Sequence, residues 1–397
     1  MLEYSASDKL TIKLKGRIDS TNAASVEEDI MAILGEHPDL PITIDCADLE
    51  YISSAGLRVL MKTKKAVKDT CLINVAPAVY DVLEITGFTE LMDIHKVLRT
   101  ISVEGCEVIG KGAKGTVYRI DKETIVKTFK AGSDVSDIEQ ERKLARTAFV
   151  LGIPTAISYD VVNIEGGGYG SVYELLDATN LADELASGRK TMDEVVQLEV
   201  DLLKTIHSTE VNPDQIPPFT DKVAKWLDCD KDHLPADKYE KLCSLVASIP
   251  EDNHLIHGDF HMKNIMYQDG ECLLIDMDSL SHGNTVFELV TIWCSYVGLG
   301  EIDNSVVEHF LGIPYQDAVT IWKKTVARFF DTEDEKVIKD VEDKVRILSY
   351  ARILSYARII RRCVRKNRVA FEIGKKEYEN AISSMCSLLE HVDSLAL

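Results

Sequence analysis

The chain has 397 residues, of which 45% are hydrophobic, and its formal net charge is −21 at pH 7. This length predicts two or three compact units, with enough apolar residues to build real cores. The negative charge argues against nonspecific binding to nucleic acid and favours cationic partners. The first residues lack the basic and apolar regions of a signal peptide. The best apolar run, 285–299, is too short to span a membrane and contains Glu288.

The nine cysteines are scattered along the chain and include no Cys-x-x-Cys pair. Such an odd, unpatterned set predicts reduced thiols in a cytoplasmic protein, and it favours neither a disulfide framework nor a zinc site. His254, His257 and His261 cluster, but no cysteine spacing joins them into a metal centre.

Residues 1–99 predict a separate α/β unit. Residues 10–16 alternate apolar and polar side chains, which is the period of a half-buried strand, and Asp19-Ser20 can cap a helix over 23–34. Further strands are expected at 40–46 and 71–75. Ser53-Ser54 should begin a helix that runs to about Lys68, and a third helix should run from Pro77 to near Gly87.

Three segments of this unit resemble the STAS family (sulfate transporter and anti-sigma factor antagonist). They are Gly16-Arg17-Ile18-Asp19, Ile52-Ser53-Ser54-Ala55-Gly56-Leu57 and Leu83-Glu84-Ile85-Thr86-Gly87-Phe88. The resemblance implies a protein partner, and it implies that Ser54 takes the place of a serine that a partner kinase phosphorylates in bacterial members. Ser53 stands where the family usually has Asp. A phosphate on Ser54 would lie at a helix N-terminus, where it is stabilised. Alternatively, both serines merely cap the helix.

A glycine-rich segment opens the second region. Gly110-Lys111-Gly112 and Gly115 lie between two strand-like stretches, and no helix pattern follows, which argues against a Rossmann unit. A strand, a glycine loop and a strand is the arrangement with which kinases cover nucleotide phosphates. The next strand, 124–129, places Lys127 where a kinase lysine contacts the α- and β-phosphates.

A helix over 135–149 offers a carboxylate partner for Lys127. Glu141 is the favoured partner and Glu139 the alternative. The strand that ends in Glu174-Leu175 should lead into a hinge between two lobes, where backbone groups can pair with an adenine.

The chemistry centres on the segment from His257 to Asn264 and on Asp276. Asp259 is expected to orient and deprotonate an acceptor hydroxyl. Asn264, five residues later, and Asp276 are expected to hold Mg²⁺ on the phosphates of ATP. Asp278 is as consistent with a second magnesium ligand as with a solvated loop.

These motifs resemble the aminoglycoside phosphotransferase family, also called choline-kinase-like phosphotransferases. The pattern His257-Gly258-Asp259-x-His261-x-x-Asn264 is typical of its small-molecule kinases, and the position of Gly152-Ile153-Pro154 implies Glu141 as the helix glutamate. Met262 replaces the common proline, and Asp276-Met277-Asp278 replaces Asp-Phe-Gly. The resemblance covers about 106–293 well and the remaining helices loosely. It implies a bilobal protein-kinase-like fold that uses ATP and Mg²⁺.

The segment from Asp276 to Gly283 is too short to be the activation segment with which protein kinases dock polypeptides. This favours a small hydroxylated acceptor, such as an aminoglycoside, choline or a sugar, and the acidic charge suits a cationic one. A serine held nearby by a tethered domain remains an alternative.

A tandem repeat, Arg346-Ile-Leu-Ser-Tyr-Ala and Arg352-Ile-Leu-Ser-Tyr-Ala, lies near the end of the chain. Its period of six is not that of a helical face, but Ile347, Tyr350, Leu354 and Ala357 follow helical spacing and predict a mostly buried helix. The segment 346–368 holds eight basic residues and no acidic residue. Its arginines are expected to pair with acidic groups of the protein, and a docking strip for an anion is the alternative.

The sequence therefore predicts an α/β domain (1–99) followed by an α+β kinase-like domain with an N-lobe (105–175) and a helical C-lobe (176–397). Two functions follow. One is an ATP- and Mg²⁺-dependent phosphotransferase for a small hydroxylated molecule, with a regulatory STAS-like domain. The other is a signalling protein whose kinase-like part phosphorylates, or senses nucleotide for, the STAS-like module. No nucleic acid or membrane is expected as a partner.

Overall fold

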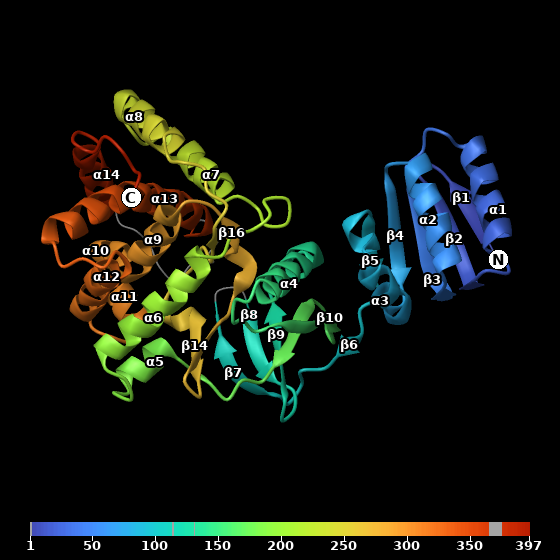
Figure 1. Ribbon diagram of the computed structural model, residues 1–397, viewed down its shortest axis with the longest axis horizontal. Coiled ribbons are helices and arrows are strands. Elements are labelled where there is room, and N and C mark those ends of the chain that lie inside the picture. Colours follow the sequence, from blue (N-terminus) through green and yellow to red (C-terminus); the bar gives the residue numbers. More distant parts are fainter. Residues whose placement is uncertain (1, 113–114, 131, 365–374) are drawn as a thin grey trace. The chain divides into compact units, whose positions relative to one another are not determined.

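The computed structural model describes residues 2–112, 115–130, 132–364 and 375–397. These residues form two compact units, Met1–Ile101 and Ser102–Leu397, and each unit has its own hydrophobic core (Figure 1).

The first unit is a sheet packed against helices. Its strands are β1 (Leu2–Ala6), β2 (Leu10–Ile18), β3 (Ile42–Ile52), β4 (Thr70–Val75) and β5 (Asp93–Lys96), and they lie in that order. β1 pairs with β2 antiparallel, and the remaining pairs are parallel. The connections hold α1 (Ala23–Glu36), α2 (Ser54–Ala66), α3 (Pro77–Ile85) and the short turn η1 (Phe88–Glu90). The segment β6 (Thr100–Ile101) ends the unit.

Alternation explains this packing. Leu10, Ile12 and Leu14 of β2 are almost fully buried, while the residues between them lie on the other face of the sheet. Helix α1 buries Ala23, Val26, Ile30 and Leu34, which lie on one face at helical spacing.

The second unit begins with an antiparallel sheet and one helix. Its strands run in the order β10-β11-β9-β8-β7. They are β7 (Glu107–Lys111), β8 (Gly115–Arg119), β9 (Thr124–Phe129), β10 (Ser158–Ile164) and β11 (Tyr169–Glu174), and the helix is α4 (Val135–Val150). Asp134 caps α4, because its side chain accepts a hydrogen bond from the N–H of Ser136.

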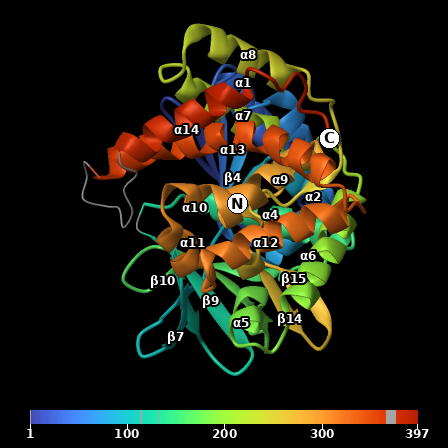
Figure 2. The ribbon, with the colours of Figure 1, turned by 90° about the vertical axis from the view of Figure 1, so that its left-hand side faces the viewer.

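The rest of the second unit is mostly helical. Its helices are α5 (Leu181–Ala186), α6 (Met192–His207), α7 (Thr220–Asp230), α8 (Ala236–Ala247), α9 (Thr285–Trp293), α10 (Leu299–Ile302), α11 (Asn304–Leu311), α12 (Tyr315–Phe329), α13 (Glu335–Val364) and α14 (Lys375–Leu388), with a π-helical turn η4 (Cys294–Gly298). Short strands and turns lie between them: β12 (Thr179–Asn180), β13 (Leu255–Ile256), η2 (Met262–Asn264), β14 (Ile265–Gln268), β15 (Glu271–Leu274), η3 (Met277–Ser279) and β16 (Ser281–His282). The long helix α13 packs against α7, α9 and α14, and Figure 2 shows α13 beside α14.

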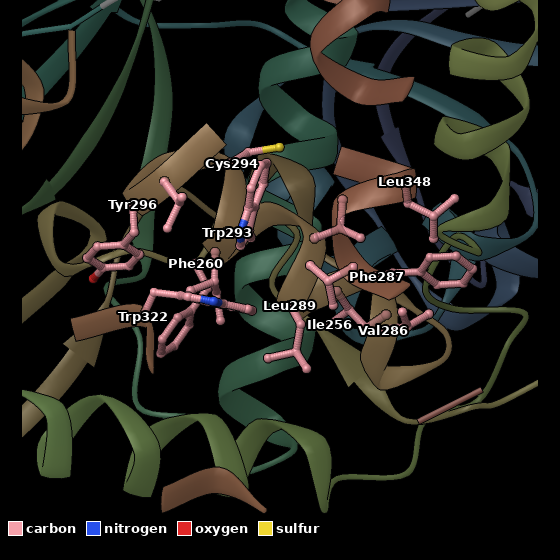
Figure 3. Packing of buried hydrophobic residues seen from close by; sticks show 14 of the residues in the cluster. Ile256, Phe260, Val286, Phe287, Leu289, Trp293, Cys294, Tyr296, Trp322 and Leu348 are labelled. Carbon is pink, nitrogen blue, oxygen red and sulfur yellow. The ribbon is translucent and has the colours of Figure 1, made fainter. Parts of the chain in front are cut away.

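The core of the helical part is built around large side chains. Trp293, Trp322 and Tyr296 are fully buried. Figure 3 draws Phe260, from the loop predicted to be catalytic, in the same cluster as Trp322 and Leu289. That loop is therefore anchored in the core by its own aromatic residue.

One stretch in the described part of the chain, Thr285–Ile302, is long and apolar enough to cross a membrane by length and composition. It is longer than the run seen in the sequence because α9, η4 and α10 follow one another without a break. This stretch is 78% buried inside the fold, as expected of a core helix.

The predicted helices and strands of both units are present, with ends shifted by a few residues. The sequence analysis missed β1 and β5, the two edge strands of the first sheet. The eight cysteines whose side chains the structure describes are free.

Candidate active site

Lys127 lies in β9, in the middle of the second unit's sheet, and meets two carboxylates. Its Nζ lies 2.9 Å from Oε1 of Glu141, on α4, and 2.8 Å from Oδ1 of Asp276, which follows β15. Glu139, the alternative partner, instead lies 3.6 Å from Arg142 on its own helix. Three residues far apart in the sequence are thus in direct contact.

The charges in this cluster support one another. Burial disfavours the ammonium of Lys127, but Glu141 and Asp276 outweigh that effect and hold the pKa of Lys127 above its usual range. The Tyr173 hydroxyl donates to Glu141 Oε1 at 3.4 Å. Lys127 therefore stays a cation, and Glu141 is held beside it.

Asp276 is placed by an unusual backbone. Its φ of 64° and ψ of 61° are left-handed, a conformation that Asp tolerates better than most residues. Oxygens of Glu141, Asp276 and Asp278 lie within 4.8 Å of one another. Such a set of carboxylates has the oxygen ligands that Mg²⁺ prefers, so Asp278 belongs geometrically to the candidate metal site.

The glycine-rich segment connects β7 to β8. Gly110 and the exposed Lys111 end β7, Gly115 begins β8, and the N–H of Gly112 donates to the Gly115 carbonyl at 2.9 Å. Residues 113–114, in the middle of the predicted loop, lie outside the described residues. A Cβ on Gly115 would come within 1.7 Å of the Thr128 carbonyl oxygen, so only glycine allows this close approach of β8 to β9.

The predicted hinge follows β11. Glu174 is exposed and accepts a hydrogen bond from the Tyr159 hydroxyl at 3.3 Å. The N–H of Leu175 donates to the Glu123 carbonyl at 2.7 Å. That N–H is therefore engaged within the protein and is not the group that can pair with an adenine here.

The side chain of Glu288 holds the backbone at the start of the loop from His257 to Asn264. This glutamate is fully buried in the first turn of α9 and accepts the backbone N–H of His257 at 2.6 Å and of Gly258 at 2.9 Å. Gly258 has a φ of +79°, and a Cβ there would lie 2.5 Å from the Ser279 carbonyl oxygen. Glu288 and Gly258 together fix the turn that presents Asp259.

Asp259 lies between two cationic or polar groups. Its carboxylate oxygens lie 3.7 Å from His261 Nε2 and 3.6 Å from Nη2 of Arg352, on α13. Burial raises the pKa of Asp259, but His261, Arg352 and His257 outweigh it and hold that pKa well below its usual range. The carboxylate is 36% exposed, so it is both ionised and reachable.

Asn264 is tied to the same loop. Its Nδ2 donates to the backbone carbonyl of Asp259 at 2.9 Å. The carboxamide oxygen is therefore the atom that Asn264 can offer to a metal.

Sequence reasoning missed two residues that shape this loop. Arg352 was seen only as part of a repeat, and nothing in its surroundings signals that it reaches Asp259. Tyr296, fully buried, accepts the N–H of Met262 at 3.1 Å, and its hydroxyl donates to the buried Glu199. The available signal in the sequence was a polar side chain within an apolar helical stretch.

In the first unit, the two serines at the start of α2 have different roles. Ser53 is the N-cap, and its Oγ accepts from the N–H of Ala55 at 3.2 Å and of Gly56 at 3.4 Å. Ser54 is the first helical residue and is exposed.

Comparison with known proteins divides the chain in the same way. The STAS domain model matches residues 4–101, and the model described as the phosphotransferase enzyme family matches residues 105–336. A protein of Bordetella bronchiseptica named an anti-sigma factor antagonist, BtrV, is 32% identical over 85 residues, which are 20% of this chain and 72% of that protein.

Solved structures similar to this chain include two kinases. A choline/ethanolamine kinase family protein from Mesorhizobium loti is 12% identical, with a TM-score of 0.47, covering 72% of this chain and 88% of its own. The aminoglycoside phosphotransferase APH(2″)-Ib with ADP bound is 14% identical, with a TM-score of 0.47, covering 72% and 95%.

Proposed function

The chain belongs to the phosphotransferase enzyme family and carries a STAS domain in residues 4–101, and from this we propose that its second unit is an ATP- and Mg²⁺-dependent kinase for a hydroxyl group of a small molecule. The observation that carries the proposal is the contact of Lys127 with both Glu141 and Asp276. A scaffold has no need to hold a charged lysine between two carboxylates from distant segments.

On this proposal, Lys127 contacts the ATP phosphates and Glu141 fixes its position. The segment from Gly110 to Gly115 covers the phosphates, and the backbone around Glu174 and Leu175 borders the adenine, with groups other than the Leu175 N–H making the pairing.

The residues present fit a magnesium ion. Asp276 and the Asn264 carboxamide oxygen would hold it, with Asp278 as a further carboxylate. When bound, Mg²⁺ supplies positive charge that neutralises the phosphates. Oxygens of the Glu141, Asp276 and Asp278 carboxylates lie within 4.8 Å of one another, and a divalent ion relieves the repulsion between like charges at such a distance.

Asp259 receives the acceptor. Its carboxylate accepts a hydrogen bond from the acceptor hydroxyl and takes the proton as the oxygen bonds to the γ-phosphorus and ADP leaves. Because Arg352 and His261 lower its pKa, Asp259 is a weak base. Its main contribution is to orient the hydroxyl, with the proton moving late.

Arg352 also bears on the kind of acceptor. Arg352 is buried, and its guanidinium lies next to the proposed reacting position at Asp259. A cationic group close to the reacting hydroxyl would be repelled there. We therefore favour an acceptor whose nearest substituents are neutral or anionic, such as a sugar, over choline or an amino group beside the hydroxyl.

The test is to incubate the protein with Mg-ATP and a panel of sugars, aminoglycosides and choline, and to measure both ADP release and the intact mass of the chain. Acceptor-dependent ADP release from an unmodified chain supports the proposal. Release that persists in Asp259→Asn contradicts the role of Asp259.

A second function is favoured by one observation, the exposure of Ser54 at the start of α2. A phosphate there would meet the positive end of the helix dipole. In this signalling alternative, the kinase-like unit phosphorylates Ser54 and so controls the binding of a protein partner. Phosphate found on Ser54, and dependent on Asp259, would select it over the metabolic role.

A further inference from the structure

Three side chains with metal-binding chemistry meet on the sheet of the first unit, on strands β4 and β5. The register pairs Cys71 of β4 with Asp93 of β5, and His95 follows two residues later on β5. Paired residues of neighbouring parallel strands point to the same face, as do residues two apart on one strand. Cys71, Asp93 and His95 therefore share one face at the edge of the sheet.

That face is the one turned away from the core. Thr70 and Leu72, the neighbours of Cys71 in β4, are buried, whereas Cys71 itself is partly exposed. The side chains of Asp93 and His95 are 66% and 51% exposed. A ligand can thus reach all three from solvent without opening the fold.

The distances suit a single small ion. The Cys71 sulfur, an Asp93 oxygen and a His95 nitrogen all lie within 4.8 Å of one another. Asp93 Oδ2 and His95 Nε2 are 2.9 Å apart. Bonds of about 2.0–2.3 Å in a tetrahedral site place ligand atoms roughly 3.3–3.8 Å apart, so small rotations of these side chains would bring them into place.

The donor atoms also suit a cation. On binding, a divalent ion would take the Cys71 side chain as the thiolate, and the thiol proton would pass to solvent. Thiolate sulfur, imidazole nitrogen and carboxylate oxygen are all ligands of Zn²⁺, whereas Mg²⁺ prefers oxygen alone.

We propose that Cys71, Asp93 and His95 form a zinc site on the STAS domain, with water in the fourth position. The cysteine spacing predicts no zinc site, because these three residues are brought together by the pairing of β4 with β5 and not by a local motif. Bound Zn²⁺ would fasten the edge strand β5 to β4 and so stabilise the domain.

The test uses the full chain, reduced and freed of metal, and Co²⁺ as a probe. We expect an absorption band from thiolate-to-cobalt charge transfer that saturates near one equivalent and disappears when Zn²⁺ is added. Cys71→Ser should abolish the band. His95→Gln, at an exposed position that should not disturb folding, should weaken binding about tenfold or more.

Two controls separate this site from others. Cys229→Ser removes a partly exposed thiol of the second unit, and Asp276→Asn alters the candidate magnesium site, so both should keep the band. Zn²⁺ should raise the melting temperature of the wild-type chain but not that of His95→Gln. The absence of a band in the wild type, its persistence in Cys71→Ser or its loss in Asp276→Asn would overturn the proposal, whether or not the chain is a kinase.

Discussion

Two ionic clusters of the second unit have central groups of opposite charge. At Lys127, one cation lies between two carboxylates, Glu141 and Asp276. At Asp259, one carboxylate lies between Arg352 and His261. In both places the pKa of the central group is moved so that it stays charged, upward for Lys127 and downward for Asp259.

The clusters differ in how they are assembled. Every member of the Lys127 cluster stands at a position that a kinase motif identifies. The Asp259 cluster joins a motif residue to Arg352, which comes from α13, much later in the chain. On the proposed function, nucleotide binding rests on residues that the sequence motifs identify, while the acceptor side also rests on Arg352, which no motif identifies. The predictions below test that division.

The largest effect should follow removal of the carboxylate at the centre of the second cluster. Asp259→Asn keeps the shape of the side chain but cannot orient or deprotonate a hydroxyl. We expect kcat to fall by about 10²–10⁴-fold, with nucleotide affinity nearly unchanged. ADP release and a nucleotide titration measure the two quantities separately. A large loss of nucleotide affinity would show that the two clusters are not separate in function.

The first cluster should respond in the opposite way. Asp276→Asn removes a metal-binding carboxylate and a partner of Lys127, so nucleotide affinity in the presence of Mg²⁺ should fall by about 10²-fold. The measurement is a nucleotide titration with Mg²⁺ and with EDTA.

Asp278→Asn is the matched control, because Asp278 lies in the same carboxylate group, whereas the ion pairs with Lys127 are made by Glu141 and Asp276. A smaller loss is expected for it. Equal titrations for the wild type and Asp276→Asn would refute the metal role of Asp276.

Arg352→Gln should change the second cluster without destroying it. Arg352 lowers the pKa of Asp259. In the variant, Asp259 therefore takes up its proton at a higher pH, and the acid limb of the kcat/KM profile shifts to higher pH. We expect roughly a tenfold loss of kcat/KM on that limb and a smaller loss at higher pH.

Arg346→Gln is the control, because Arg346 occupies the same place in the preceding repeat. Its guanidinium lies 3.0 Å from Glu301 and 2.7 Å from the Tyr350 hydroxyl, away from Asp259. Its acid limb should stay where the wild-type limb lies. An unmoved limb in Arg352→Gln would mean that His261 and His257 hold the pKa of Asp259 low without Arg352.

The same contrast explains what could be predicted from the sequence. The STAS and kinase-like folds were correctly predicted, because glycines, caps and motif residues are local signals. The repeat was expected to form a buried helix, and Ile347, Tyr350 and Leu354 are buried in α13; the side chain of Ala357 lies outside the description. The pairing of Arg346 with Glu301 and of Arg352 with Asp259 follows the expected pairing with acidic groups. Which acids would be chosen could not be predicted, because helix packing brings them together and no sequence spacing encodes that packing.

A third carboxylate sharpens the comparison, because no cation among the described residues is paired with it. Asp230, at the end of α7, is fully buried, and neither of its oxygens has a hydrogen-bond partner among the described residues. Burial raises its pKa to about 8. The folded state therefore binds a proton that the unfolded state releases above about pH 4, and the stability linked to Asp230 is lost as pH rises toward 8.

Asp230→Asn should remove this penalty. We expect its free energy of unfolding to exceed that of the wild type by up to about 5 kcal/mol at pH 8, with the difference vanishing near pH 4 and activity unchanged. Denaturant unfolding across this pH range measures it. Glu199, whose pKa burial raises to about 7, contributes a slope of the same sign to both proteins, so the difference between them isolates Asp230. If the difference in free energy of unfolding did not depend on pH, Asp230 would have a partner that compensates its charge, as Arg352 and His261 compensate the charge of Asp259.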